Sequence, residues 1–166
     1  MFAVTTYLYA RAGEVNALTW DDVDLARGVV HIHASVSRTT GEVGTTKTRA
    51  TRRVPIEPTL LPLLQAMHDE CGGKGRVSPV DLTDRKLSRQ LPRCLALAGV
   101  DRADLVASDA SRKPMTFHDL RGTGITWAAV RGDDALKVKQ RAEGDDDADA
   151  HEQRDRPGPE RQRGRR

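Results

Sequence analysis

A chain of 166 residues is long enough for one domain with a core of its own. Its apolar stretches are too short to cross a bilayer, and its first residues lack the basic region of a signal peptide, so we expect a cytoplasmic protein with no membrane partner. Cys71 and Cys94 stand alone without the spacing of a zinc site, and no acidic cluster suits Mg²⁺. We therefore expect reduced cysteines, no metal and no cofactor.

Charge divides the chain into two parts. Residues 143–166 hold eight acidic residues and six arginines, and their only apolar side chains are Ala148 and Ala150. Such a segment buries too little apolar surface to offset its conformational entropy, which predicts a disordered acidic, then Arg/Gly/Pro-rich tail. Because the whole chain carries +3, residues 1–142 carry +5. A basic globular part favours a polyanionic partner such as DNA or RNA.

The first part of the chain predicts short helices and then a basic hairpin. Val30 and Ile32 alternate with His31 and His33, which indicates a strand with two different faces. Pro55 favours an edge position for the last strand, or the end of that strand. The expected order is a helix over 2–12, a helical turn over 14–18, a turn over 20–24, a strand over 29–34, a hairpin loop over 37–46 and a return strand over 47–56.

The second part of the chain predicts helices. Pro58 suits the first turn of a helix that Gly72 would end. Pro92, inside the next helix, predicts a kink or a late start. Thr116 is expected to cap a third helix. The helices are expected over residues 58–71, 84–98, 117–130 and 133–142, with a loop over 99–114. The fold class is mainly α with a small antiparallel β-sheet (α+β), in one domain over residues 1–142.

Two pairs of residues have the spacing of an anion site. His118 and Arg121 lie three apart on a predicted helix, so both can face one anion. The arginine fork matches two phosphate oxygens, and the histidine exchanges protons near neutral pH. Arg11 and Glu14 have the same spacing, so the carboxylate can hold the guanidinium in place. Taken alone, each pair is more often an ordinary charged helix surface.

The predicted hairpin adds a group of cations. Lys47 and its neighbours suit a phosphate backbone, and a lysine whose pKa is lowered by other cations can protonate a leaving oxygen. The alternative is a solvated edge strand that its charges protect from aggregation. The candidate DNA-binding residues are Arg38, Arg49, Arg52 and Arg53.

Together these motifs resemble the catalytic domain of the tyrosine recombinase (phage integrase) family. An Arg-x-x-Glu helix, a turn with Leu18, Trp20 and Asp22, and a hairpin from Thr46-Lys47-Thr48 to Val54-Pro55 follow in the family's order. The segment His118-Asp119-Leu120-Arg121 matches the family's later motif. The resemblance covers about residues 11–142 and implies a DNA strand-breaking and rejoining enzyme that needs no metal or nucleotide.

The resemblance also implies a role for each motif residue. Arg11 and Arg121 would clamp the scissile phosphate, Glu14 would orient Arg11, Lys47 would protonate the leaving 5′ oxygen and His118 would assist proton transfer. A tyrosine would attack phosphorus and form a 3′-phosphotyrosyl link.

The pattern ends after Ala142. The family's Gly-His pair would fall near Glu143, and its tyrosine near Gln153, but the only tyrosines are Tyr7 and Tyr9. A frameshift near codon 143 is one hypothesis.

We expect a truncated, nucleoid-associated DNA-binding integrase that is inactive alone. The alternatives are a regulator or decoy of an intact integrase, a chain that receives a tyrosine in trans or self-associates on DNA, and a small basic domain that binds RNA or protein.

Overall fold

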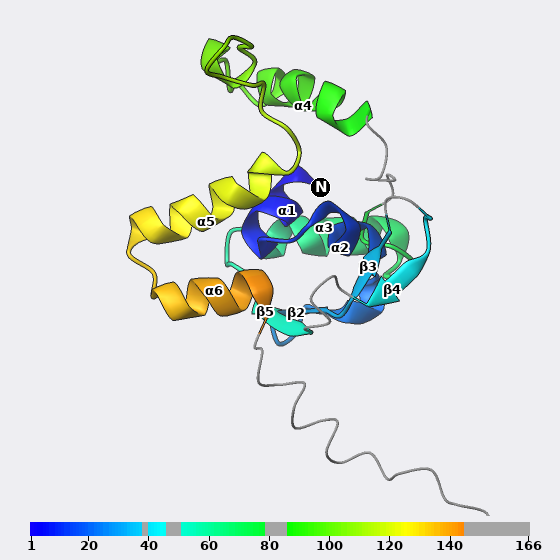
Figure 1. The fold of residues 1–166 in the computed structure, drawn as a ribbon. Helices are drawn as coiled ribbons and strands as arrows, with labels where there is room; N and C mark the ends of the chain where they lie inside the picture. The colour runs from blue at the N-terminus through cyan, green and yellow to red at the C-terminus, as the bar shows by residue number, and fades with distance from the viewer. Residues whose placement is uncertain (38–39, 46–50, 79–85, 145–166) are drawn as a thin grey trace, which may run out of the picture.

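A computed structural model describes residues 1–37, 40–45, 51–78 and 86–144, with no side-chain description for 45 and 86–88. The α+β class is confirmed: the described residues form helices and two small antiparallel sheets, and the sheets lie below and to the right of most helices in Figure 1. The elements are α1 (Phe2–Leu8), α2 (Ala12–Ala17), η1 (Trp20–Asp22), β1 (Val23–Asp24), β2 (Val29–Ile32), β3 (Ala34–Val36), β4 (Val43–Thr45), β5 (Arg52–Pro55), α3 (Leu61–Cys71), α4 (Lys86–Leu97), η2 (Ala103–Leu105), α5 (Asp119–Arg131) and α6 (Ala135–Glu143).

The strands form two sheets. One has the order β1-β2-β5, and the other pairs β3 with β4. The strand expected over 29–34 is therefore divided at His33. In the larger sheet Val30 pairs with Val54, and Val29 pairs with Pro55. The edge position expected for Pro55 is confirmed, since β5 has a described neighbour on one side alone.

The first helix is shorter than its apolar spacing predicts. It ends at Leu8 because Tyr9 has a φ of 51°, in the left-handed region, and the Ala10 N–H bonds to the Thr5 carbonyl at 3.3 Å. The prediction of one helix over 2–12 was wrong for this reason. The break turns the Tyr9 carbonyl toward α5, and it lets a new helix begin after Arg11.

One main core joins the N-terminal helices to the larger sheet. Its most deeply buried side chains come from α1, α2, β2, β5, α3 with its N-cap residue, and α4, and they are Val4, Leu8, Val15, Val30, Val54, Leu60, Leu64 and Leu91. Helix α5 packs closely on α1. A Cβ on Gly124 would lie 2.0 Å from the Thr6 carbonyl oxygen, so glycine allows this approach.

The later helices occur in the expected order, with shifted ends. Pro58 lies in a turn, and α3 begins at Leu61; Gly72, with a φ of 65°, ends it. Pro92 lies inside α4. His118 is the N-cap of α5, whereas Thr116 donates from its backbone N–H and its hydroxyl to Asp119 Oδ2. Asp134 caps α6. None of the described helices is long and apolar enough to span a membrane. Almost all of the expected tail, residues 145–166, lies outside the described residues.

Candidate functional site

A buried carboxylate, Glu14, stands at the centre of the site. Its side chain is 1% exposed, and it lies in the first turn of α2. The Arg11 backbone N–H donates to Glu14 Oε2 at 2.8 Å, and Arg11 Nη1 donates to Oε1 at 3.2 Å. The expected contact between these two residues is therefore present. Because one carboxylate caps the helix and holds the guanidinium, Arg11 has a fixed position.

A third residue, Arg52, completes the shell around Glu14. It reaches in from β5 and donates from Nη2 to Oε2 at 2.6 Å and from Nη1 to Oε1 at 3.2 Å. Burial alone raises the pKa of Glu14, but the bonds and charges of Arg52 and Arg11 outweigh this, so the pKa lies below its ordinary value. Glu14 is therefore a carboxylate at neutral pH.

Arg121 approaches the same cluster from α5. It is 8% exposed, and its Nη1 donates to the Tyr9 carbonyl at 2.6 Å. Burial lowers its pKa, and the cations Arg11 and Arg52 add to this effect, while Glu14 and, more weakly, Glu143 oppose it. Arg121 thus lies within electrostatic range of the Glu14 group, although it is more than a hundred residues away in the chain. We call Arg11, Glu14, Arg52 and Arg121 the arginine cluster.

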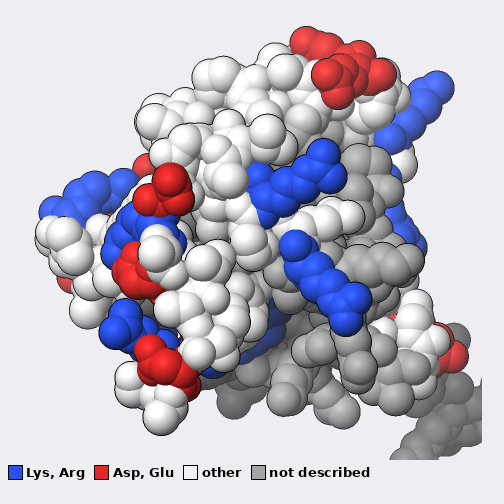
Figure 2. Space-filling model, turned by 90° about the horizontal axis from the view of Figure 1, so that it is seen from above, with Lys and Arg blue, Asp and Glu red and all other residues white. Residues whose placement is uncertain are grey.

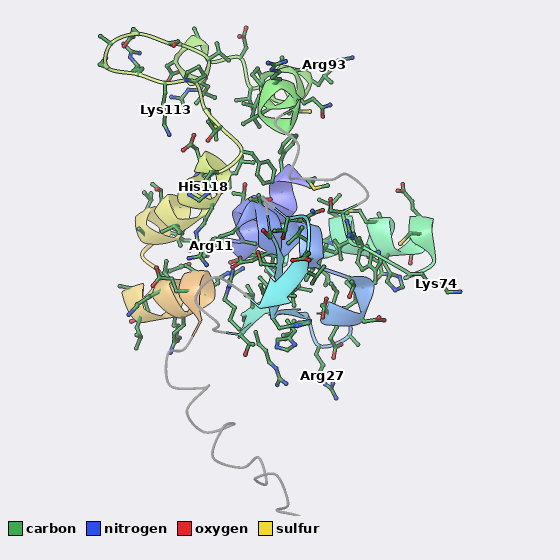
Figure 3. The ribbon with its side chains drawn as sticks, turned by 45° about the vertical axis from the view of Figure 1, so that its right-hand side comes forward. Arg11, Arg27, Lys74, Arg93, Lys113 and His118 are labelled. Atoms are coloured by element: carbon green, nitrogen blue, oxygen red, sulfur yellow. The ribbon has the colours of Figure 1, made fainter. Side chains whose placement is uncertain are left out.

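His118 lies at the edge of this arrangement. It is exposed at the N-terminal end of α5, one helical turn before Arg121. Figure 3 shows Arg11 between the N-terminal helices and the α5–α6 pair, with His118 at the start of α5. The site is therefore assembled from α2, β5 and α5, with His118 on the solvent side.

The candidate DNA-binding residues of the basic hairpin differ in whether the structure describes them and in whether they are exposed. Lys47, Arg38 and Arg49 lie outside the described residues. Arg53 is exposed on β5, whereas Arg52 is 5% exposed, because alternate residues of the strand face opposite sides. The sequence could have predicted the burial of Arg52, because it lies two residues before the apolar Val54 and therefore on the same side of the strand.

Sequence reasoning missed Arg141, a residue of α6. Its Nη2 donates to the Tyr7 carbonyl at 2.8 Å, its Nη1 pairs with Glu57 at 3.1 Å, and its guanidinium lies 4.9 Å from the centre of the Tyr9 ring. Its own carbonyl accepts a bond from Arg52 Nε at 3.0 Å. Arg141 thus joins α6 to α1 and to the arginine cluster. Nothing in the local sequence marks it, because its partners come from distant segments.

Positive charge on the surface is divided into patches. On the face that Figure 2 shows, basic and acidic side chains alternate at one side, and basic side chains near the middle stand apart from the acidic ones. In the arginine cluster, two guanidinium groups pair with one carboxylate and a third, that of Arg121, lies within electrostatic range. Such an arrangement suits an anion with several oxygen atoms.

The family model of phage integrases matches residues 1–143. The chain belongs to the phage integrase family. This family is the one that the order of the motifs indicates, and its members are DNA recombination and integration proteins. Among curated proteins, none matches the chain.

Solved integrases share the fold. The structure of the Tn1549 transposon integrase with circular intermediate DNA has a TM-score of 0.64 and 15% identity, over 85% of this chain and 48% of that one. The same integrase with transposon right-end DNA has a TM-score of 0.62 and 15% identity, over 87% and 50%. XerA recombinase has a TM-score of 0.56 and 19% identity, over 84% and 46%. The chain therefore spans about half the length of these proteins.

Proposed function

We propose that this chain binds double-stranded DNA and holds one backbone phosphate at the arginine cluster, as part of site-specific recombination. The observation that supports the proposal is the charge of the cluster. Arg11 and Arg52 pair with Glu14, and Arg121 lies within electrostatic range of it, so these four residues carry a net +2 in a largely buried place. Like charges at close range repel one another, and a phosphate diester would relieve this repulsion.

Each residue has a distinct proposed role. Arg11 keeps 29% of its side chain exposed, so it can hold Glu14 and still meet a phosphate. Arg121 would be the second clamp, and exposed His118 would exchange a proton with the reacting oxygens. Arg52 is 5% exposed, and its Nε, Nη1 and Nη2 all donate to the Arg141 carbonyl or to Glu14, so we assign it to holding Glu14 and, through Glu14, Arg11. It is a positioning residue.

The basic hairpin would supply the rest of the DNA contact. Arg53 is exposed at the edge strand β5, where it can reach a phosphate without any loss of a buried bond. Lys47, Arg38 and Arg49 belong to the same proposed surface, with Lys47 as the acid for the leaving 5′ oxygen. The role of Lys47 follows from the family resemblance, and those of Arg38 and Arg49 follow from the charge of the predicted hairpin.

We also propose that the 166 residues do not cleave DNA alone. The nucleophile of the family is a tyrosine, and this sequence has Tyr7 and Tyr9. Tyr9 is 4% exposed beneath the Arg141 guanidinium, and burial, the largest effect, raises its pKa. Tyr7 packs edgewise on Trp127, with 6.4 Å between the ring centres. Neither position suits attack on a phosphate that the arginine cluster holds.

A non-catalytic role is consistent with the same geometry. A chain that binds DNA without cutting it would occupy the site of an intact integrase and regulate it, or would take a tyrosine from a partner in trans. Mixing the chain with an intact integrase separates these cases, because a regulator lowers recombination and a complementing partner raises it.

The DNA-binding proposal is tested by the effect of salt on affinity. The full chain is titrated into a fluorescently labelled duplex, and anisotropy is followed at several KCl concentrations. If phosphate contacts carry the affinity, the logarithm of the binding constant falls linearly with the logarithm of the salt concentration, by about 0.9 per phosphate contact. A slope near zero, or equal affinity for an uncharged polymer, would overturn the proposal.

A further inference from the structure

A second group of polar side chains lies outside the arginine cluster. Asp22 is the last residue of η1, His31 lies in β2, and His33 follows β2 directly. One potential ligand atom from each of the three lies within 4.8 Å of the others. His33 Nε2 is 2.8 Å from Asp22 Oδ1, and the two histidine rings are 5.0 Å apart. The three side chains thus face one point from two segments.

The alternation of β2 produces this geometry. Val30 and Ile32 are buried beneath the sheet, at 0% and 2% exposure, so His31 and His33 stand on the opposite, solvent-facing side. His31 is half-buried, and His33 keeps 46% of its side chain exposed. Two histidines at this spacing on one side of a strand offer two imidazole nitrogens to the same ion.

Hydrogen bonds from Thr19, in the same turn, fix the orientation of the Asp22 carboxylate. The Thr19 backbone N–H and hydroxyl both donate to Asp22 Oδ2, at 3.0 and 2.8 Å. The other oxygen, Oδ1, is thereby directed toward His33. Supporting bonds of this kind fix the orientation of metal-binding carboxylates and strengthen metal affinity.

We propose that Asp22, His31 and His33 form a binding site for a divalent transition-metal ion such as Zn²⁺. Two imidazole nitrogens and one carboxylate oxygen are common zinc ligands, and water would fill the fourth position of a tetrahedral site. Tetrahedral ligands stand about 3.3 Å apart around Zn²⁺. The three ligand atoms now lie within 4.8 Å of one another, and the ion would take the place of the hydrogen bond between His33 Nε2 and Asp22 Oδ1.

The charge of Arg53 and the small number of oxygen ligands determine which class of metal ion suits the site. Arg53 pairs directly with His31 across the sheet and is exposed on the same side, so its charge disfavours any cation there. Mg²⁺ and Ca²⁺ require several oxygen ligands, and this site offers one carboxylate. Imidazole nitrogens suit Zn²⁺, Ni²⁺ and Cu²⁺, so these ions match this donor set better.

The bound ion would connect two parts of the fold. Asp22 follows the helix that carries Glu14, and β2 pairs with the strand that carries Arg52. A metal bridge from η1 to β2 would fix these segments relative to each other, and it would stabilise the folded chain because the unfolded chain does not bring the ligands together. This inference does not depend on DNA binding.

The test uses untagged full-length protein with Co²⁺ and Zn²⁺ salts as probes. Co²⁺ is titrated while its visible d–d absorption is recorded, and Zn²⁺ is then added in competition. We expect one ion per chain, an absorption band typical of tetrahedral nitrogen and oxygen ligands, and displacement by Zn²⁺. The melting temperature should rise by roughly 4 °C or more at a hundredfold excess of Zn²⁺ over its dissociation constant.

Variants locate the ion. His31→Gln, His33→Gln and Asp22→Asn should each weaken binding by at least tenfold, about the loss that follows removal of an outer partner of a metal ligand. His118→Gln removes an exposed imidazole from another element, so its affinity should equal that of the wild type. Circular dichroism checks that each variant is folded. No binding by the wild type, or undiminished binding by the three variants, would overturn the proposal.

Discussion

Arg52 Nη2 lies 2.6 Å from Glu14 Oε2, and both side chains are almost fully buried. The pair joins β5 to α2 across 38 positions of the chain. Burial of an ionised side chain costs free energy, and the opposite charge of the partner offsets that cost. Removal of either partner would leave the other buried charge uncompensated. The same pair holds the carboxylate that fixes Arg11. The stability of the fold and the geometry of the site therefore depend on one contact.

Replacing Arg52 should show this dependence. Arg52→Met leaves Glu14 buried with Arg11 as its remaining cationic partner, and we expect the free energy of unfolding to fall by about 3–5 kcal/mol. The matched control is Arg53→Met, the exposed neighbour on the same strand, with an expected change within about 0.5 kcal/mol. Urea denaturation followed by circular dichroism measures both. Equal losses in the two variants would show that burial of the Arg52–Glu14 pair is energetically unimportant.

Acid should weaken the same contact. The folded-state pKa of Glu14 lies below its ordinary value of 4.5, so Glu14 stabilises the fold above that pH and loses the effect as the pH falls through the folded-state pKa. The variant Glu14→Gln lacks the charge. The wild type should be the more stable protein at neutral pH, and the difference should shrink as the pH falls below 4.5 and through the lowered folded-state pKa. Unfolding free energies at several pH values measure it; a pH-independent difference would contradict the assignment.

The outcome for Arg52 shows what the sequence could predict. Periodicity predicted most of the helices and their order, because local spacing decides which side of an element is apolar, but β1 and β4 lie in segments predicted as a turn and a hairpin loop. Alternation along the strand put Arg52 on the same inner side as Val54, but its positive charge favoured the prediction of a surface residue that contacts DNA. Its partner Glu14 lies in another element. Only the packed fold brings the two together.

Gly124 provides a test of how α5 is held. A Cβ at this position would lie 2.0 Å from the Thr6 carbonyl oxygen and 2.8 Å from Tyr9 Cδ1, so Gly124→Ala must push α5 away from α1. We expect a loss of roughly 1–3 kcal/mol, and weaker DNA binding as Arg121 moves with the helix. Gly122→Ala in the same helix meets open space and should stabilise the protein by about 0.5–1 kcal/mol. Thermal denaturation compares the two; similar effects would contradict the close packing of α1 and α5.

The end of α1 could not be predicted in the same way. Val4 and Leu8 have helical spacing, which favoured a longer helix, yet the left-handed conformation of Tyr9 stops it. A tyrosine with positive φ carries a conformational cost that tertiary contacts must offset. One such contact is the bond from Arg121 to the Tyr9 carbonyl, made by a helix far along the chain. Local spacing contains no information on it.

Removal of one clamp should change the salt dependence of DNA binding. Arg121→Ala is expected to weaken binding and to reduce the salt slope by about 0.9, the amount for one phosphate contact. Arg27→Ala removes an exposed arginine that pairs with Asp24 in the turn between β1 and β2, and Figure 3 shows Arg27 well away from Arg11. Its slope should be closer to that of the wild type. Anisotropy titrations at several salt concentrations measure the slope for both variants. An unchanged slope for Arg121→Ala would exclude a phosphate contact at Arg121.

The most direct test of a chain that holds DNA without cutting it is a suicide-substrate assay. A nicked duplex that carries a candidate recombination site is incubated with the full chain and then run on a native gel and on a denaturing gel. We predict a complex on the native gel that disappears as salt rises, and no protein–DNA adduct on the denaturing gel. A covalent adduct would contradict the account, because it would show that a residue of this chain acts as the nucleophile.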